Sequence, residues 1–163
     1  MARRALGSDR SVARRVSPKI PLVELIESAS SNNRGSYMDK GEITRVVDAW
    51  IEGQEAGKGA DERGSNWWAI ERVMDWALHG EADLLWTFVL STYNRNISDR
   101  VVSVLAAGPL EDLLAKHGPE FIERVEQLAR QDKKFNFLLG GVWQNTMSED
   151  VWKRVQAVRH STW

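Results

Sequence analysis

The feature that most constrains this chain is the spacing of its apolar residues, which recur every three or four positions along most of its length. In the clearest case the apolar positions are Ile43, Val46, Val47, Trp50 and Ile51. This spacing places them on one face of an α-helix. No segment alternates apolar and polar residues for long enough to predict a strand. We therefore expect an all-α fold with about seven or eight helices.

The segment from Glu81 to about Asn94 differs from the others because it is apolar around most of its circumference. A helix of this kind is typical of the centre of a helical protein, where neighbours cover it on all sides. The segment before it, from about Trp67 to His79, has a wide apolar face. We expect that face to be buried, and its members are Trp67, Ile70, Val73, Met74, Ala77 and Leu78.

Residues that commonly begin and end helices divide this pattern. Ser98, Asp132 and Ser148 stand where a side-chain oxygen can accept hydrogen bonds from the first turn of a helix. Gly80 stands where a glycine in the left-handed conformation commonly ends one. These residues predict helices that start near 99, 133 and 149, and one that ends at 79.

Two Gly-Pro pairs, Gly108-Pro109 and Gly118-Pro119, favour further boundaries. Glycine suits the position after a helix, and proline suits the first position of the next one. The short breaks between successive helices predict an irregular α–α stack that resembles HEAT-type repeats. A compact helical bundle stays open as the alternative, since no strict period runs through the sequence.

The charge of the chain is divided unevenly. The formal net charge of the 163 residues is -1, but residues 1–20 hold six basic residues and one acidic residue, so they carry +5 and the remainder carries -6. We expect a flexible basic arm over residues 1–16 and a single α-helical domain over residues 17–163. The arginines of the arm are Arg3, Arg4, Arg10, Arg14 and Arg15.

Such an arm could bind nucleic acid, an anionic lipid surface or an acidic partner. It could equally be a solvated tail, or it could precede a true start at Met38, where the helical pattern begins. No apolar run approaches the roughly 18–20 residues that span a bilayer. Cysteine is absent. These observations predict a cytoplasmic protein without a membrane span.

Residues with catalytic or metal-binding spacing are not found. The three histidines, His79, His117 and His160, stand near three different helix ends and form no metal-binding pattern with carboxylates. The chain has no nucleophile elbow and no phosphate-binding glycine loop. We therefore predict no catalytic residue, no cofactor and no metal, although an enzyme with an unrecognised site stays open as a third alternative.

Tryptophan is the more informative residue, with eight in the chain. Trp68 projects about 100° from Trp67, beside Arg72 and Asp75, and away from the main apolar stripe. Exposed Trp and Arg are enriched at the energetic centres of protein interfaces. We expect Trp68, Arg72 and Asp75 to contact a protein partner. The alternative is that a neighbouring helix covers this side.

Two further carboxylates, Glu111 and Asp112, follow the first Gly-Pro pair. They could receive a basic side chain of a partner. Alternatively, they could neutralise the exposed N–H groups at the start of a new helix, which is an architectural role.

The run from Leu105 to Val155 resembles a bacterial family of small helical proteins of unknown function. The resemblance is carried by Ala106–Leu114 (AAGPLEDLL), by His117-Gly118 and by Gly140–Trp143 (GGVW). It becomes weaker towards Trp67 and does not include the first 60 residues. It implies no activity, so it places no catalytic residue in this chain.

Together, these observations predict a non-enzymatic protein–protein interaction module of immunity type or adaptor type. Its size, its acidic body and its lack of catalytic patterns favour that role, because acidic inhibitors use electrostatic steering towards basic partners. A nucleic-acid-associated protein that uses the basic arm is the alternative.

Overall fold

The computed structural model describes residues 39–56 and 64–163, and these residues fold into helices and loops without a strand. The expected all-α class is confirmed, and the number of helices is close to the seven or eight expected. The predictions about residues 1–38 lie outside the described residues. The helices are α2 (Lys40–Ala56), α3 (Trp67–His79), α4 (Ala82–Tyr93), α5 (Asp99–Leu105), the π-helical turn η1 (Ala106–Leu110), α6 (Glu111–Gln131), α7 (Lys133–Leu139) and α8 (Glu149–Val158).

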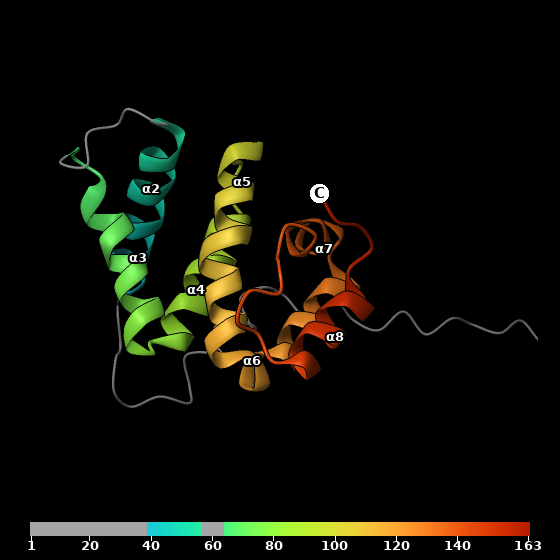
Figure 1. Ribbon diagram of the computed structural model, residues 1–163. Helices are drawn as coiled ribbons and strands as arrows, with labels where there is room; N and C mark the ends of the chain where they lie inside the picture. Colours follow the sequence, from blue (N-terminus) through green and yellow to red (C-terminus); the bar gives the residue numbers. More distant parts are fainter. Residues whose placement is uncertain (1–38, 57–63) are drawn as a thin grey trace, which may run out of the picture.

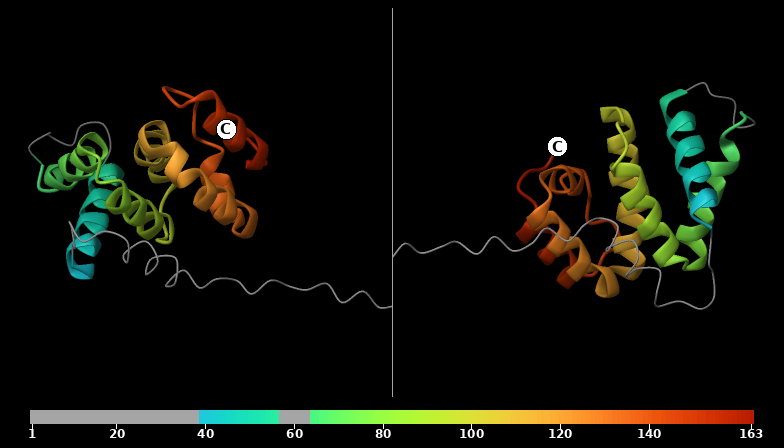
Figure 2. Two further views of the ribbon diagram at one scale, coloured as in Figure 1. Left: turned by 90° about the horizontal axis from the view of Figure 1, so that it is seen from below. Right: turned by 180° about the vertical axis from the view of Figure 1, so that it is seen from behind.

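The helices form two connected groups (Figures 1 and 2). In the first group α2 packs against α3, α4 and α5. In the second group α6 packs against α7 and α8. Helix α4 and the turn η1 contact helices of both groups and join them. Helix α3 lies at the edge of the molecule farthest from α8 (Figures 1 and 2).

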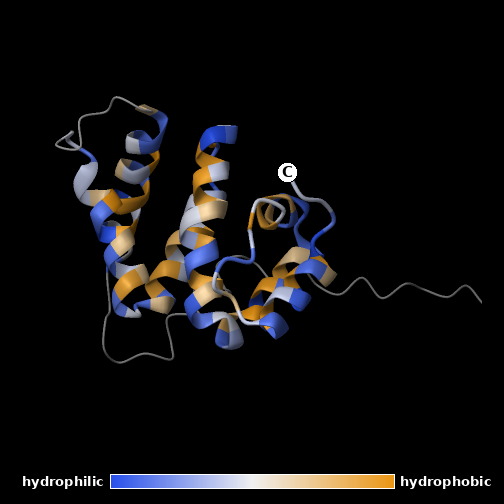
Figure 3. Ribbon diagram, viewed as in Figure 1, coloured by the Kyte–Doolittle hydropathy of each residue, from blue (hydrophilic) through white to orange (hydrophobic). Residues whose placement is uncertain are grey.

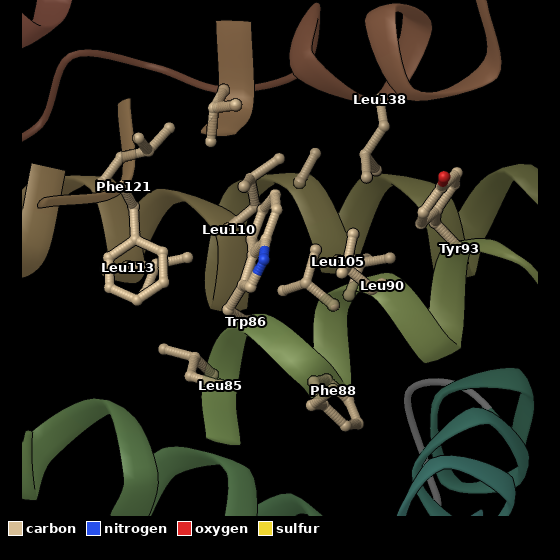
Figure 4. Close-up of a cluster of buried hydrophobic side chains, with 14 of the residues drawn as sticks. Leu85, Trp86, Phe88, Leu90, Tyr93, Leu105, Leu110, Leu113, Phe121 and Leu138 are labelled. Carbon is tan, nitrogen blue, oxygen red and sulfur yellow. The ribbon is translucent and has the colours of Figure 1, made fainter. Parts of the chain in front are cut away.

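Helix α4 supplies the centre of the core, as its all-round apolar character predicts. Its Trp86 and Phe88 are fully buried (Figure 4). Phe88 meets Trp50 of α2 edge to face, with ring centroids 5.2 Å apart, and Trp86 meets Phe135 of α7 in the same way at 6.0 Å. Edge-to-face pairs are a favoured arrangement of buried rings. These contacts bind both groups of helices to α4. The ribbon coloured by hydropathy shows apolar residues (orange) along the helices of both groups (Figure 3).

The predicted helix ends are largely confirmed. The side chains of Ser98, Asp132 and Ser148 each accept backbone N–H groups from the first turns of α5, α7 and α8. Gly80 ends α3 in the left-handed conformation, with φ of 80°. Asn66 precedes α3 but makes no capping bond with its side chain. Local sequence therefore determines most of these boundaries.

The boundary predicted at Gly108-Pro109 is wrong. The turn η1 carries the helix from α5 into α6 without an end, and the N–H of Glu111 donates to the carbonyl of Ala106, five residues back. Proline lacks an N–H and its ring crowds the turn before it. A π-helical turn is wider than an α-helical one and accommodates both effects. Gly108 consequently does not need a left-handed conformation.

The second Gly-Pro pair does interrupt the helix. His117 leaves the helical region, with φ of -126° and ψ of 18°, so α6 bends immediately before Gly118-Pro119. A Cβ atom on Gly118 would lie 2.8 Å from both Cγ atoms of Val151 on α8. Real Cβ atoms do not approach that closely. Gly118 therefore allows α6 and α8 to pack in direct contact.

Candidate functional site

The outward side of α3 exposes large apolar side chains. Trp68 is 41% exposed, Met74 53% and Leu78 67%. The expected burial of Met74 and Leu78 is wrong, while Trp76, which the expected apolar face did not include, is buried. The face of α3 that is actually buried consists of Ala69, Val73, Trp76 and Ala77.

This difference has a simple cause. Helices α2 and α4 and the turn η1 are the elements that contact α3 substantially. Because α3 lies at the edge of the molecule, they cover one side of it, and the wide apolar face is only partly used (Figure 1). We call the uncovered side the α3 outer face and define it by Trp68, Arg72, Met74, Asp75 and Leu78. All five side chains are exposed.

Charged groups on the α3 outer face are nearly free of the rest of the protein. Asp75 Oδ1 lies 2.8 Å from His79 Nδ1, one helical turn away, and both side chains are largely exposed. Arg72 makes no ion pair within the part of the chain that the structure describes. Exposed pairs of this kind contribute little to stability. The predicted contact residues Trp68, Arg72 and Asp75 thus lie together and are accessible.

Glu111 lies elsewhere and serves the fold. Its side chain is buried, with 8% of the residue exposed. Its Oε2 accepts the backbone N–H of Trp143 at 3.0 Å, and its Oε1 accepts the Nδ2 of Asn145 at 2.9 Å. Asn145 has a positive φ of 46°, a conformation that asparagine tolerates better than most residues. Both carboxylate oxygens are therefore occupied by the loop between α7 and α8.

This arrangement removes Glu111 from the contact surface, since its carboxylate is not available to a partner. Its bonds also differ from the architectural alternative, because the carboxylate binds a distant loop and not the N–H groups of its own helix. Asp112, the next residue, is half-buried. Among the described residues, no hydrogen bond or ion pair joins Asp112 to the α3 outer face.

A second set of exposed aromatic side chains belongs to the C-terminal part. Phe137, Trp143 and Trp163 are all exposed. The rings of Phe137 and Trp163 stack with centroids 5.3 Å apart, and Trp163 Nε1 donates to the carbonyl of Phe137 at 2.8 Å. The sequence patterns did not single out Phe137, and Trp143 entered only as the last residue of the Gly140–Trp143 segment of the resemblance. The signal that could have found Phe137 is its place on the polar side of α7, whose buried residues include Phe135, Leu138 and Leu139.

Trp163 also explains a pair of glycines. A Cβ on Gly141 would lie 2.5 Å from the ring of Trp163, and one on Gly140 would lie 2.5 Å from the carbonyl of Ser161. Side chains at these two positions would displace the end of the chain. The indole of Trp163 therefore packs directly on the backbone of Gly140 and Gly141, which leaves it less free to contact a partner protein.

The described titratable groups with shifted pKa values are Tyr93, Glu126 and Arg154, and each has a structural role. Burial, together with the neighbouring Asp132, raises the pKa of Tyr93 to about 12, so its hydroxyl stays protonated. A hydrogen bond from Arg154 lowers the pKa of the Glu126 carboxyl, and that bond also raises the pKa of Arg154. Arg154 Nε lies 2.8 Å from Glu126 Oε1, so this pair ties α8 to α6.

The part of the chain that the structure describes has neither a metal-binding cluster nor a membrane-spanning helix. Residues 39–56 and 64–163 contain no group of three or more His, Cys, Asp or Glu that could hold a metal ion. Within the same residues, no helix has the length and apolar character to cross a bilayer.

Comparison with known proteins gives one match. The profile of DUF6869, a family of unknown function, matches residues 56–163. The chain belongs to this family. The match covers the stretch in which the sequence resemblance was found, from Leu105 to Val155, and extends to the end of the chain. No curated protein and no solved structure matches the chain.

The structure brings together the two main segments of the resemblance. A Cβ on Gly141 would lie 3.0 Å from the Cβ of Ala106, and the carboxylate of Glu111 binds the backbone N–H of Trp143. The Ala106–Leu114 segment and the Gly140–Trp143 segment therefore pack directly against each other. This contact holds the loop between α7 and α8 against the turn η1, so these residues support the fold of this DUF6869 member.

Proposed function

We propose that this protein is a non-enzymatic protein–protein interaction module and that the α3 outer face is its contact surface. The observation that carries the proposal is the accessible set formed by Trp68, Arg72 and Asp75, with Met74 and Leu78 beside it. Large apolar side chains that stay exposed, together with Trp and Arg, are typical of protein interfaces. An immunity-type or adaptor role in the cytoplasm is the form of this function that we propose.

The geometry favours the α3 outer face over the C-terminal aromatic residues as the contact surface for a partner. Phe137 and Trp163 are stacked on each other and bonded together, so part of their surface is already used within the molecule. Arg72, in contrast, has no ion-pair partner among the described residues, and its charge is free to meet another protein. A desolvated charge pair at the centre of an interface contributes specificity as well as affinity.

Affinity capture tests this function. The full chain is immobilised and exposed to the soluble proteins of its native cells, beside the double variant Trp68→Ala, Arg72→Ala and the matched control Glu149→Ala, Lys153→Ala. The control removes a largely exposed ion pair of α8. We expect a stoichiometric partner with the wild type and the control, and its loss with the α3 variant. Capture that is equal for all three proteins would refute the α3 outer face as the contact surface.

A nucleic-acid-associated role through the basic arm is the second candidate, and the +5 charge of residues 1–20 favours it. The remainder of the chain is acidic and would repel phosphates, so the arm would have to supply the whole interaction. Deletion of residues 1–19 should then abolish binding, and binding by the intact chain should weaken steeply with salt. Absence of binding at low salt would exclude this role.

A further inference from the structure

The exposed residues of α3 include a regular stripe. Trp68, Arg72, Asp75 and His79 are separated by four, three and four residues, so they lie along one line of the helix surface. This alternation of four and three is the spacing by which one helix packs along another. All four residues are exposed, and none of them belongs to the buried side of α3.

The stripe is complementary to itself. When a second α3 lies antiparallel across the first, related by a twofold axis, each Arg72 faces the partner's Asp75 and each Trp68 faces the partner's His79. Two-fold symmetry requires such self-complementarity, because each contact occurs twice with the roles exchanged. At each end of the stripe, the indole of Trp68 then lies against the imidazole of the partner's His79. At its centre, Arg72 and Asp75 of the two copies form two pairs of opposite charges.

Neighbouring residues suit this arrangement. Met74 and Leu78 lie beside the stripe and are more than half exposed. A second copy would remove their apolar surface from water, which favours association. The Asp75–His79 pair is an exposed pair within one helix, so exchanging it for a pair with Arg72 across the axis costs little. Glu71, the other charged residue of the exposed side, is also free to turn towards solvent.

We propose that the α3 outer face docks a second copy of this chain, with Arg72 against the partner's Asp75 on both sides of a twofold axis. This inference rests on the proposed function, since it names the partner of the same surface. Among the described helices, α3 lies at the edge (Figure 2), so none of them fills the space beside its outer face, where a second molecule could dock. The stripe carries one positive charge, at Arg72, and one negative charge, at Asp75, so it can neutralise a second copy of itself. A surface that binds an unrelated basic or acidic protein would not need this balance.

Charge reversal tests the pairing. Arg72→Glu places two acidic groups opposite each other, and Asp75→Arg places two basic groups opposite each other, so each variant alone should dimerise more weakly than the wild type. Like charges across an interface disfavour association, and we expect the dimer to weaken by about tenfold or more. A mixture of the two variants should restore a dimer, because each new Glu then faces a new Arg. Sedimentation equilibrium of the intact chain and its variants measures each state.

The exposed pair of α8 provides the control. Glu149→Lys combined with Lys153→Glu reverses an ion pair away from α3 and should leave the dimer unchanged. A wild-type chain that is monomeric at every concentration would overturn the inference, as would a dimer that survives both single variants. If the wild type is monomeric while capture of another protein depends on Trp68 and Arg72, self-docking fails and the proposed function stands.

Discussion

The α3 outer face and the C-terminal part of the molecule use polar side chains in opposite ways. In the C-terminal part, the buried amide of Asn136 donates to the carbonyls of Ala129 and Val158 and accepts the N–H of His160. Glu111 likewise satisfies both of its carboxylate oxygens inside the protein. On the α3 outer face, Asp75 binds only its neighbour on the same helix, and Arg72 binds no carboxylate among the described residues.

The contrast shows how to separate residues that build the fold from those that are free for contact. A buried polar group must find partners within the protein, because leaving it unpaired is costly. Residues such as Glu111 therefore become structural even when their position beside a turn suggests recognition. An exposed polar group has no such requirement, so Arg72 and Asp75 are available to another molecule.

The largest expected effect on stability comes from Glu111, and it should distinguish this residue from its neighbour Asp112 on α6. Glu111→Ala leaves the N–H of Trp143 and the amide of Asn145 without their acceptor, and we expect a loss of about 3 kcal/mol in the free energy of unfolding. Asp112→Ala, at a half-buried position, should change it by less than about 0.5 kcal/mol. Urea unfolding monitored by tryptophan fluorescence measures both. Equal losses would contradict the structural role assigned to Glu111.

A smaller effect is expected at the close contact of α6 and α8. Gly118→Ala puts a methyl group against Val151, and we expect a loss of about 2 kcal/mol from overpacking. Gly108→Ala is the matched control, because its added Cβ has no neighbour within 4 Å. Alanine is a better helix former than glycine, so the control should be neutral or up to about 1 kcal/mol more stable. Thermal unfolding gives both values, and equal destabilisation would refute the packing argument.

The ion pair between α8 and α6 should make stability depend on pH. Because Arg154 lowers the pKa of Glu126, the ionised carboxylate stabilises the fold above the pKa it has in the unfolded chain, and this stability is lost as pH falls through the folded pKa. Arg154→Met should therefore destabilise the protein at pH 7, and the difference from wild type should shrink as pH falls below the ordinary range of a glutamate, near about 4.3. Urea midpoints measured across that range provide the test.

Lys153→Met serves as the comparison, because Lys153 forms only an exposed pair with Glu149, 3.8 Å away. It should have little effect at any pH. A difference between Arg154→Met and wild type that is constant across the range would show that the pair does not act through the charge of Glu126.

The smallest effect on stability is expected on the α3 outer face. Trp68→Ala and Arg72→Ala should each change the free energy of unfolding by less than about 0.5 kcal/mol, since exposed side chains of this kind support little of the fold. The same variants should reduce association through this face. Differential scanning calorimetry checks the first statement. A loss of several kcal/mol would place these residues in the fold and remove the contrast between the two regions.

Much of the fold could be predicted because it depends on residues near one another in sequence. The caps at Ser98, Asp132 and Ser148 and the left-handed Gly80 act within one helical turn. The central place of α4 follows from its apolar circumference. For the site, the angle of Trp68, Arg72 and Asp75 to the main stripe of α3 indicated that they could be exposed, but the sequence left open that a neighbouring helix covers them.

Other features could not be predicted because they depend on segments that are distant in sequence and pack against the residue in question. Helix periodicity marked Met74 and Leu78 as apolar, but neighbours do not cover that side of α3. Nothing local to Glu111 indicates that a loop 32 residues later supplies its hydrogen-bond donors. The Gly108-Pro109 pair is a common boundary, but here a wider turn carries the helix across it.

The sequence by itself determined that this chain is helical, where α5, α7 and α8 begin and α3 ends, and which helix lies at the centre. Those properties arise from backbone propensities, capping bonds and apolar periodicity, which act over a few residues. The tertiary structure decided which apolar face stays in solvent and which carboxylate is buried. Burial depends on the surface that distant segments provide, so it is known only when the helices have packed.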